Sequence, residues 1–107
     1  MSGARLDRLA DVAQILRRRD LAKLGKLAQA RNESAARLAA LPARQELTDD
    51  PALNAARLAH AQWAQEQRIR LNQTLARQSA AVLEQKLHAT RSLGRALALE
   101  KLRKGAR

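Results

Sequence analysis

The sequence predicts an all-α protein: two long antiparallel helices forming a coiled-coil hairpin, the second helix longer than the first. Ala and Leu supply 24 and 19 of the 107 residues, and a composition dominated by Ala, Leu and Arg is typical of long helices. Both prolines, Pro42 and Pro51, lie in one break between two uninterrupted stretches. The scarcity of β-branched and aromatic residues leaves strands without support.

The first helix is expected over about residues 4–41, where apolar residues recur at steps of three and four. Asp20 falls near the apolar stripe, and Arg31 and Ser34 weaken it further on, which indicates stutters rather than a strict heptad repeat. Gly25 either permits a close helix approach or is a weak point. Pro42 ends the helix because it removes a backbone donor and restricts the preceding residue.

A loop over residues 42–50 and a second helix over about 51–104 complete a single hairpin domain, 1–107. Asp50 is a favourable N-cap residue, and Pro51 suits the first helical position. Leu16, Leu27, Leu38 and Leu83 are expected among the best protected side chains. The stripe expected to face the first helix contains two polar interruptions, Asn72 and Ser79, and these apolar or small residues: Leu53, Ala56, Trp63, Ile69, Ala76, Leu83, Thr90, Leu93 and Leu97.

The helix lengths predict an unpaired end. A short loop makes the helices antiparallel neighbours, and a first helix of about 38 residues cannot cover a second of about 54. The terminal segment, residues 90–107, is therefore expected to have no intramolecular partner. It is both basic and rich in leucine, which makes it the predicted binding surface.

Composition argues against a catalytic or cofactor-binding role. His60 and His88 lie 28 residues apart, too far for joint metal coordination, and the acidic residues are scattered along the helices. The glycines form no phosphate-binding loop. We expect a protein that is not an enzyme and binds no cofactor or metal. Neither a secretory signal nor an apolar run long enough to span a membrane is found, so a cytoplasmic location is expected.

The net charge of +11 favours an anionic partner. The alternative is that Arg is simply used freely on solvated helices. Arg17–Arg19 resembles a nucleic-acid-binding run, yet three consecutive helical residues spread over about 200° and form no single patch. Trp63, the one aromatic residue, is either packed against the first helix or an exposed anchor for a partner.

A long-helix hairpin with a longer, basic second helix resembles the FliJ/YscO family of flagellar and type III secretion stalk proteins. The resemblance rests on Leu6-Asp7-Arg8-Leu9, on Ala36–Leu41 and on Ser92–Leu102. It implies a rod that inserts into the ring of the export ATPase and contacts the export gate, at the cytoplasmic face of a membrane export apparatus. The chain is shorter than typical members and lacks their Tyr and Phe residues, so no family site residues are carried over.

Two other classes stay open: a basic helical nucleic-acid-associated protein, and a small export chaperone or scaffold that binds a partner helix. Self-association is also compatible with the sequence. The predicted partner-binding residues come from the terminal segment, the first turns of the chain and the single tryptophan: Arg91, Leu93, Arg95, Leu97, Lys101, Leu102, Arg103, Lys104, Arg5, Arg8 and Trp63.

Overall fold

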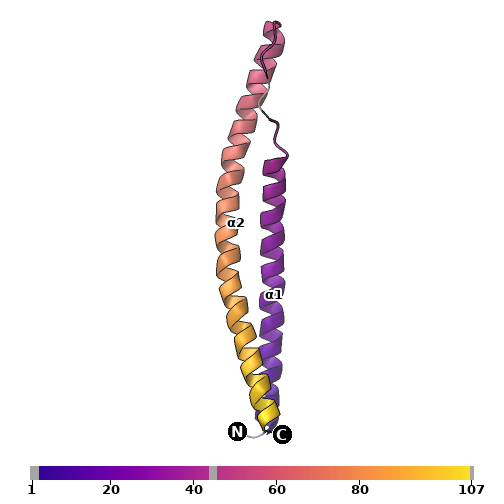
Figure 1. Cartoon of the computed structure of the whole chain (residues 1–107), viewed down its shortest axis with the longest axis vertical. Helices are drawn as coiled ribbons and strands as arrows, with labels where there is room; N and C mark the ends of the chain where they lie inside the picture. The colour runs from indigo at the N-terminus through magenta and orange to yellow at the C-terminus, as the bar shows by residue number, and fades with distance from the viewer. Residues whose placement is uncertain (1–2, 44–45, 107) are drawn as a thin grey trace. The chain divides into compact units, whose positions relative to one another are not determined.

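The computed structural model describes residues 3–43 and 46–106 and shows an all-α helical hairpin. Helix α1 spans Gly3–Ala39 and helix α2 spans Pro51–Gly105 (Figure 1). The predicted fold class is confirmed. Helix α1 ends two residues before the expected Leu41, because the last turn closes with a hydrogen bond from the Leu41 amide to the Leu38 carbonyl at 3.3 Å.

The start of α2 is set by Asp50, as predicted. Its Oδ1 accepts hydrogen bonds from the amides of Ala52 at 3.0 Å and Leu53 at 3.4 Å, which are otherwise unsatisfied donors of the first turn. Its carbonyl accepts the Asn54 amide, the first bond of the helix. Asp50 is therefore the N-cap residue of α2.

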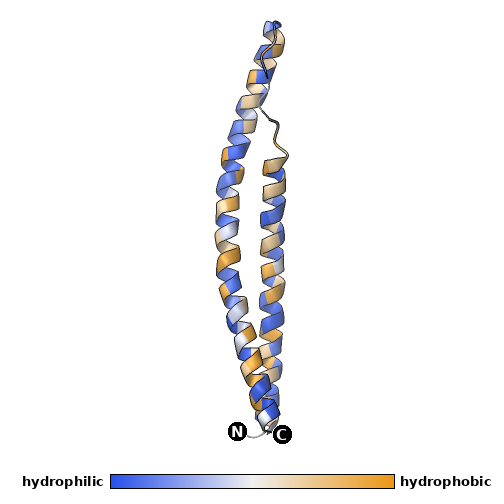
Figure 2. Cartoon of the chain, viewed as in Figure 1, coloured by the Kyte–Doolittle hydropathy of each residue, from blue (hydrophilic) through white to orange (hydrophobic). Residues whose placement is uncertain are grey.

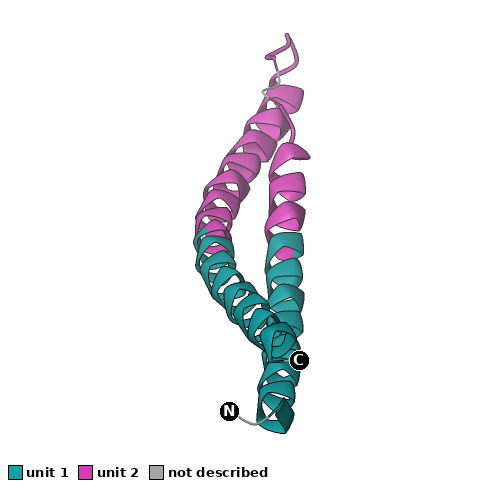
Figure 3. Cartoon of the chain, turned by 60° about the horizontal axis from the view of Figure 1, so that its bottom comes forward, with its two compact units in different colours: residues 1–29, 80–107 teal, residues 30–79 magenta. Residues whose placement is uncertain are grey.

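The chain divides into two compact units (Figure 3): unit 1 contains residues 1–29 and 80–107, and unit 2 contains residues 30–79. The beginning of α1 and the end of α2 both belong to unit 1. Unit 2 contains the end of α1, the connecting loop and the first half of α2.

In unit 1 the two helical segments pack through a narrow seam of small residues. Ala10, Ala13, Ala89 and Ala96 are buried, and Val82 is the largest fully buried side chain. Small side chains let two helices approach closely, although each buries little apolar area. The seam therefore depends on close backbone approach more than on large interlocking side chains.

A polar cluster interrupts this seam and fixes its register. Asp20 accepts a hydrogen bond from the hydroxyl of Ser92, and its backbone carbonyl accepts one from Gln85 Nε2 at 3.0 Å. Gln85 and Ser92 are both buried, so sliding one helix past the other would leave buried polar groups unpaired. Polar residues at seam positions are known to specify register in coiled coils.

Burial follows a heptad repeat without a stutter, which corrects the sequence-based expectation. All the buried positions of the two helices, together with about half of the half-buried ones, fall on a series that alternates steps of four and three, which is the a/d pattern of a coiled coil. In α1 these positions are 6, 10, 13, 17, 20, 24, 27, 31, 34 and 38, and in α2 they are 64, 68, 71, 75, 78, 82, 85, 89, 92, 96, 99 and 103.

The stripe predicted for α2 is wrong by one residue. Leu83 is 63% exposed, whereas its neighbour Val82 is 1% exposed. Apart from the half-buried Ser79, every predicted stripe member on α2 is exposed, Asn72 included. In the unit 1 part of α2 the leucines at 83, 87, 93 and 97 lie outside the seam, where the buried positions are Val82, Gln85, Ala89, Ser92 and Ala96. Figure 2 shows hydrophobic and hydrophilic residues mixed along both helices. Leu16, Leu27 and Leu38 are half-buried.

The connecting loop in unit 2 lies along the first turns of α2. Arg57 Nη1 donates to the Glu46 carbonyl at 2.6 Å, and the Asn54 amide group exchanges hydrogen bonds with the backbone of Thr48. Farther along α2, Arg68 donates to the Pro42 carbonyl at 3.2 Å. The extra length of α2 is therefore taken up at the loop end.

This loop path overturns the expectation of an unpaired terminal segment. In unit 1, Arg103 Nε lies 3.9 Å from Asp7 Oδ1, Ser92 donates to Asp20, and Ala96 is 2% exposed against α1. The described part of the segment, residues 90–106, thus packs against the start of α1, and Arg107 lies outside the described residues. Across the described helices, no stretch is long and apolar enough to cross a membrane.

Candidate partner-binding groove

Two adjoining depressions mark the surface of unit 1 where α1 meets the end of α2. The first, which we call the terminal groove, has a volume of about 410 Å³. Its long apolar side chains come from one face of α1, with Leu99 contributed by α2. The residues that line it are Leu9, Val12, Ala13, Leu16, Ser92, Arg95, Ala98 and Leu99.

The terminal groove exists because α1 carries a second apolar row beside its seam. Leu9, Val12 and Leu16 follow one another at steps of three and four, so they share a helix face next to the buried Ala10 and Ala13. Leu9 and Val12 are exposed and Leu16 is half-buried. A row of this kind, opposite the small Ala98, leaves space for the apolar face of another helix.

The second depression, which we call the basic pocket, adjoins the groove through the shared residues Leu16, Ser92 and Arg95. It has a volume of about 240 Å³. Three guanidinium groups lie around it, and one carboxylate, that of Asp20, accepts the Ser92 hydroxyl. The residues completing the pocket are Arg19, Asp20, His88 and Arg91.

Charge is concentrated in the unit that holds these depressions. Unit 1 contains fourteen Lys or Arg and five Asp or Glu, a net charge of +9, whereas unit 2 has a net charge of +2. An apolar groove that leads into a cationic pocket suits an amphipathic segment with apolar residues on one turn and a carboxylate on the next.

Arg103 lies where the start of α1 and the end of α2 meet. Its Nη2 lies 2.5 Å from Glu100 Oε1, and its Nε lies 3.9 Å from Asp7 Oδ1. The hydrogen bond to Glu100 raises the pKa of the guanidinium above its ordinary value, with the charges of Glu100, Asp7 and Asp11 adding to the effect. Arg103 is therefore a structural contact between the helix ends, in addition to being a predicted partner-binding residue.

The structure brings some predicted site residues together and separates others. Arg91 and Arg95 line the basic pocket, and Arg95 also lines the terminal groove. Lys101 and Leu102 line a further depression with Leu6. Leu93 and Leu97 line none of these depressions. Three more predicted partner-binding residues of unit 1 are exposed, namely Arg5, Arg8 and Lys104.

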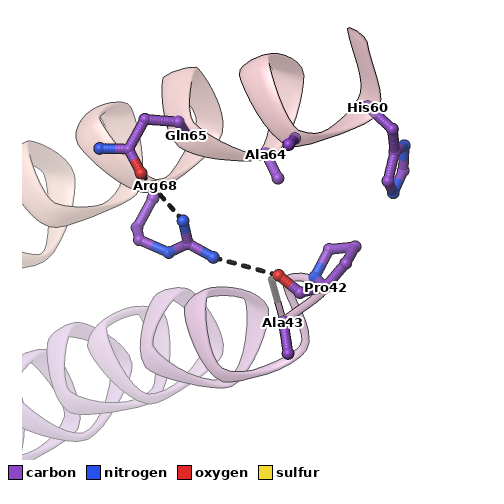
Figure 4. A pocket seen from close by; sticks show the side chains of 7 residues that line it. Pro42, Ala43, His60, Ala64, Gln65 and Arg68 are labelled. Carbon is purple, nitrogen blue, oxygen red and sulfur yellow. Dashed lines mark hydrogen bonds between the residues drawn. The ribbon is translucent and has the colours of Figure 1, made fainter. Parts of the chain in front are cut away.

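Trp63 belongs to unit 2 and not to this surface. It is 48% exposed, so it is not a seam residue, and its ring stacks on His60 with centroids 5.5 Å apart. The seam position beside it is the buried Ala64. Nearby, a pocket of about 260 Å³ is lined by residues of α2 and of the loop, among them His60, Ala64, Gln65, Arg68, Pro42 and Ala43 (Figure 4).

Sequence reasoning missed Leu9, Val12, Leu16, Arg19, His88 and Leu99 as parts of one site. The signal was present in α1, where Leu9, Val12 and Leu16 form a row distinct from Leu6, Ala10 and Ala13. The sequence-based interpretation placed Leu6, Leu9, Val12 or Ala13, and Leu16 in one stripe and left Ala10 out of it, because large residues were expected to face the seam. No protein-family model, curated protein or solved structure matches this chain.

Proposed function

We propose that this chain is a non-enzymatic binding protein that holds an acidic amphipathic helix of a protein partner in the terminal groove. The observation that carries the proposal is the continuity of an apolar groove with a basic pocket through Leu16, Ser92 and Arg95. Apolar residues of the partner helix would contact Leu9, Val12 and Leu99. A carboxylate one turn away would contact Arg91 or Arg95.

The resemblance to the FliJ/YscO family supports a more specific proposal. The resemblance implies a rod that inserts into the ring of the export ATPase, and we propose that the helix ends of this chain enter it, because they carry the groove and most of the charge. The proposed partner is accordingly the export ATPase ring, with the export gate as a second contact, and the proposed location is the cytoplasmic face of an export apparatus.

Two variants of α1 test the proposal as a matched pair. Val12→Glu places a carboxylate in the terminal groove, whereas Ile15→Glu makes the same change at an exposed position that does not line it. Both residues are more than half exposed in the unbound chain, so neither variant should unfold it. Binding to the purified export ATPase would be measured by fluorescence anisotropy of the labelled full-length chain.

Val12→Glu should weaken binding at least tenfold, because it buries a charge against apolar residues and faces an acidic partner. Ile15→Glu should leave the affinity nearly unchanged, apart from a small long-range effect of its charge. Equal losses in the two variants would refute the groove as the site. Tight binding of duplex DNA that both variants weaken alike would instead indicate nonspecific phosphate neutralisation.

A further inference from the structure

A second apolar surface of unit 1 lies on α2 and plays no part in the terminal groove. We call it the outer strip. All its members are exposed, and they share an arc of about 120° on one side of the helix. The strip consists of Leu83, Lys86, Leu87, Thr90, Leu93, Gly94 and Leu97.

The outer strip has the composition of an interface and not of a solvated helix face. Lys86 is its one charged member, although 29% of the chain is charged. Leu83, Leu87 and Leu97 are each more than 60% exposed, and Leu83 and Leu87 lie on successive turns. Interface cores are depleted of charge in this way, whereas the outer face of a helical hairpin is ordinarily charged.

The side-chain hydroxyl of Thr90, at the centre of the strip, already donates a hydrogen bond within this chain. The acceptor is the Lys86 carbonyl, at 2.8 Å, in the same helix. A partner that covers Thr90 would therefore leave no unpaired hydroxyl donor behind. Four residues on, Gly94 has no neighbour within 4 Å of an added Cβ, so no contact among the described residues accounts for a glycine there.

The strip is symmetric about Thr90. Leu87 and Leu93 stand three residues before and after it, and Leu83 and Leu97 stand seven residues before and after it. Lys86 and Gly94 are likewise four residues away on either side. A two-fold interface joins the same patch of both subunits, so it requires a patch that is complementary to itself.

We propose that the outer strip binds the outer strip of a second copy of this chain, antiparallel, with the two-fold axis at Thr90. Leu83 then packs beside Leu97 of the other copy, and Leu87 beside Leu93. The long side chain of Lys86 crosses the other helix at Gly94, where the missing side chain gives it room to reach solvent.

The size of the strip sets the strength of the dimer. Fifteen residues of helix span roughly 22 Å, and a helix is about 10 Å wide. This contact is smaller than the roughly 800 Å² per partner of a standard interface, so the dimer should be weak and reversible. Each copy carries +11, and salt screens their repulsion, so self-association should tighten as salt rises.

Cysteine cross-linking tests both the contact and its register, since the chain contains no cysteine of its own. Thr90→Cys places two thiols at the proposed two-fold axis. The control is Gln73→Cys, another exposed position on α2, whose thiols would lie roughly 50 Å apart in the antiparallel dimer. Both full-length variants would be oxidised with glutathione and analysed by non-reducing electrophoresis.

We expect a disulfide dimer from Thr90→Cys at least tenfold faster than from Gln73→Cys, with the difference growing as salt is added. Equal rates would mean random collision, and would overturn the proposal. Sedimentation of Thr90→Arg and Gln73→Arg, which have the same net charge, gives an independent measure. Thr90→Arg alone should weaken self-association roughly tenfold, and equal behaviour of the two would overturn the proposal as well.

Discussion

Adjacent residues of α2, Val82 and Leu83, offer the sharpest prediction on the seam. Val82→Ala removes two buried methyl groups, at about 0.8 kcal/mol each, and leaves a cavity, so the free energy of unfolding should fall by about 1.6 kcal/mol or more. Leu83→Ala removes a larger side chain that is 63% exposed, and should change it by less than about 0.5 kcal/mol.

The assay is thermal and urea unfolding followed by circular dichroism, at low protein concentration and low salt so that self-association does not contribute. For a helical domain of this length, the Val82→Ala loss corresponds to a fall in melting temperature of roughly 6–12 °C. The register expected from the sequence alone predicts the opposite order. A larger loss for Leu83→Ala than for Val82→Ala would refute the observed seam.

Three further substitutions test single features of the hairpin. Arg17→Leu should raise the free energy of unfolding in urea by about 1 kcal/mol. The reason is that Arg17 Nε is buried at a seam position without a hydrogen-bond partner among the described residues. A lower free energy of unfolding would contradict this. Gly25→Ala should also raise the free energy of unfolding by about 1 kcal/mol, since an added Cβ meets nothing within 4 Å and the helical backbone suits alanine. A destabilised Gly25→Ala chain would point to a close contact there. Asp50→Ala should lower the local stability of the first turn of α2 by about 1 kcal/mol, which would be measured as faster amide hydrogen exchange at Ala52 and Leu53. Unchanged exchange at these two amides would rule out Asp50 as the N-cap.

The fold class and the start of α2 could be predicted because they depend on local chemistry. Pro42 and Pro51 confine the break, and Asp50 caps α2 through its own side chain. These signals act over a few residues, and no tertiary contact overrides them. The position of the hairpin turn therefore follows directly from the sequence.

The register of α2 could not be predicted from apolar periodicity alone. Residues 69, 76, 83, 90 and 97 repeat every seven residues, and so do residues 68, 75, 82, 89 and 96 one position earlier. The first set contains more large apolar residues, yet the second set faces α1. Close approach through Ala89 and Ala96, together with the pairing of Ser92 with Asp20, decides between the two registers.

Whether the terminal segment packs against α1 could not be predicted, because it depends on the path of the connecting loop. The hydrogen bonds from Arg57 to the Glu46 carbonyl and from Arg68 to the Pro42 carbonyl join residues that are 11 and 26 positions apart. No local sequence pattern predicts them. Removing residues 91–107 is therefore a poor test of binding, because it also uncovers the buried Leu6, Ala10 and Ala13. Point substitutions on the exposed groove avoid this loss of packing.

Hydrogen–deuterium exchange of the full-length chain, with and without the export ATPase, tests most directly where the partner binds. Binding in the terminal groove should slow amide exchange in peptides covering residues 6–19 and 88–102, and leave residues 51–65 unchanged. The apolar contacts and the cationic pocket lie in the first two ranges, and Trp63 lies in the third. Protection confined to residues 51–65 would contradict the proposed site and place the contact at Trp63 and the loop end.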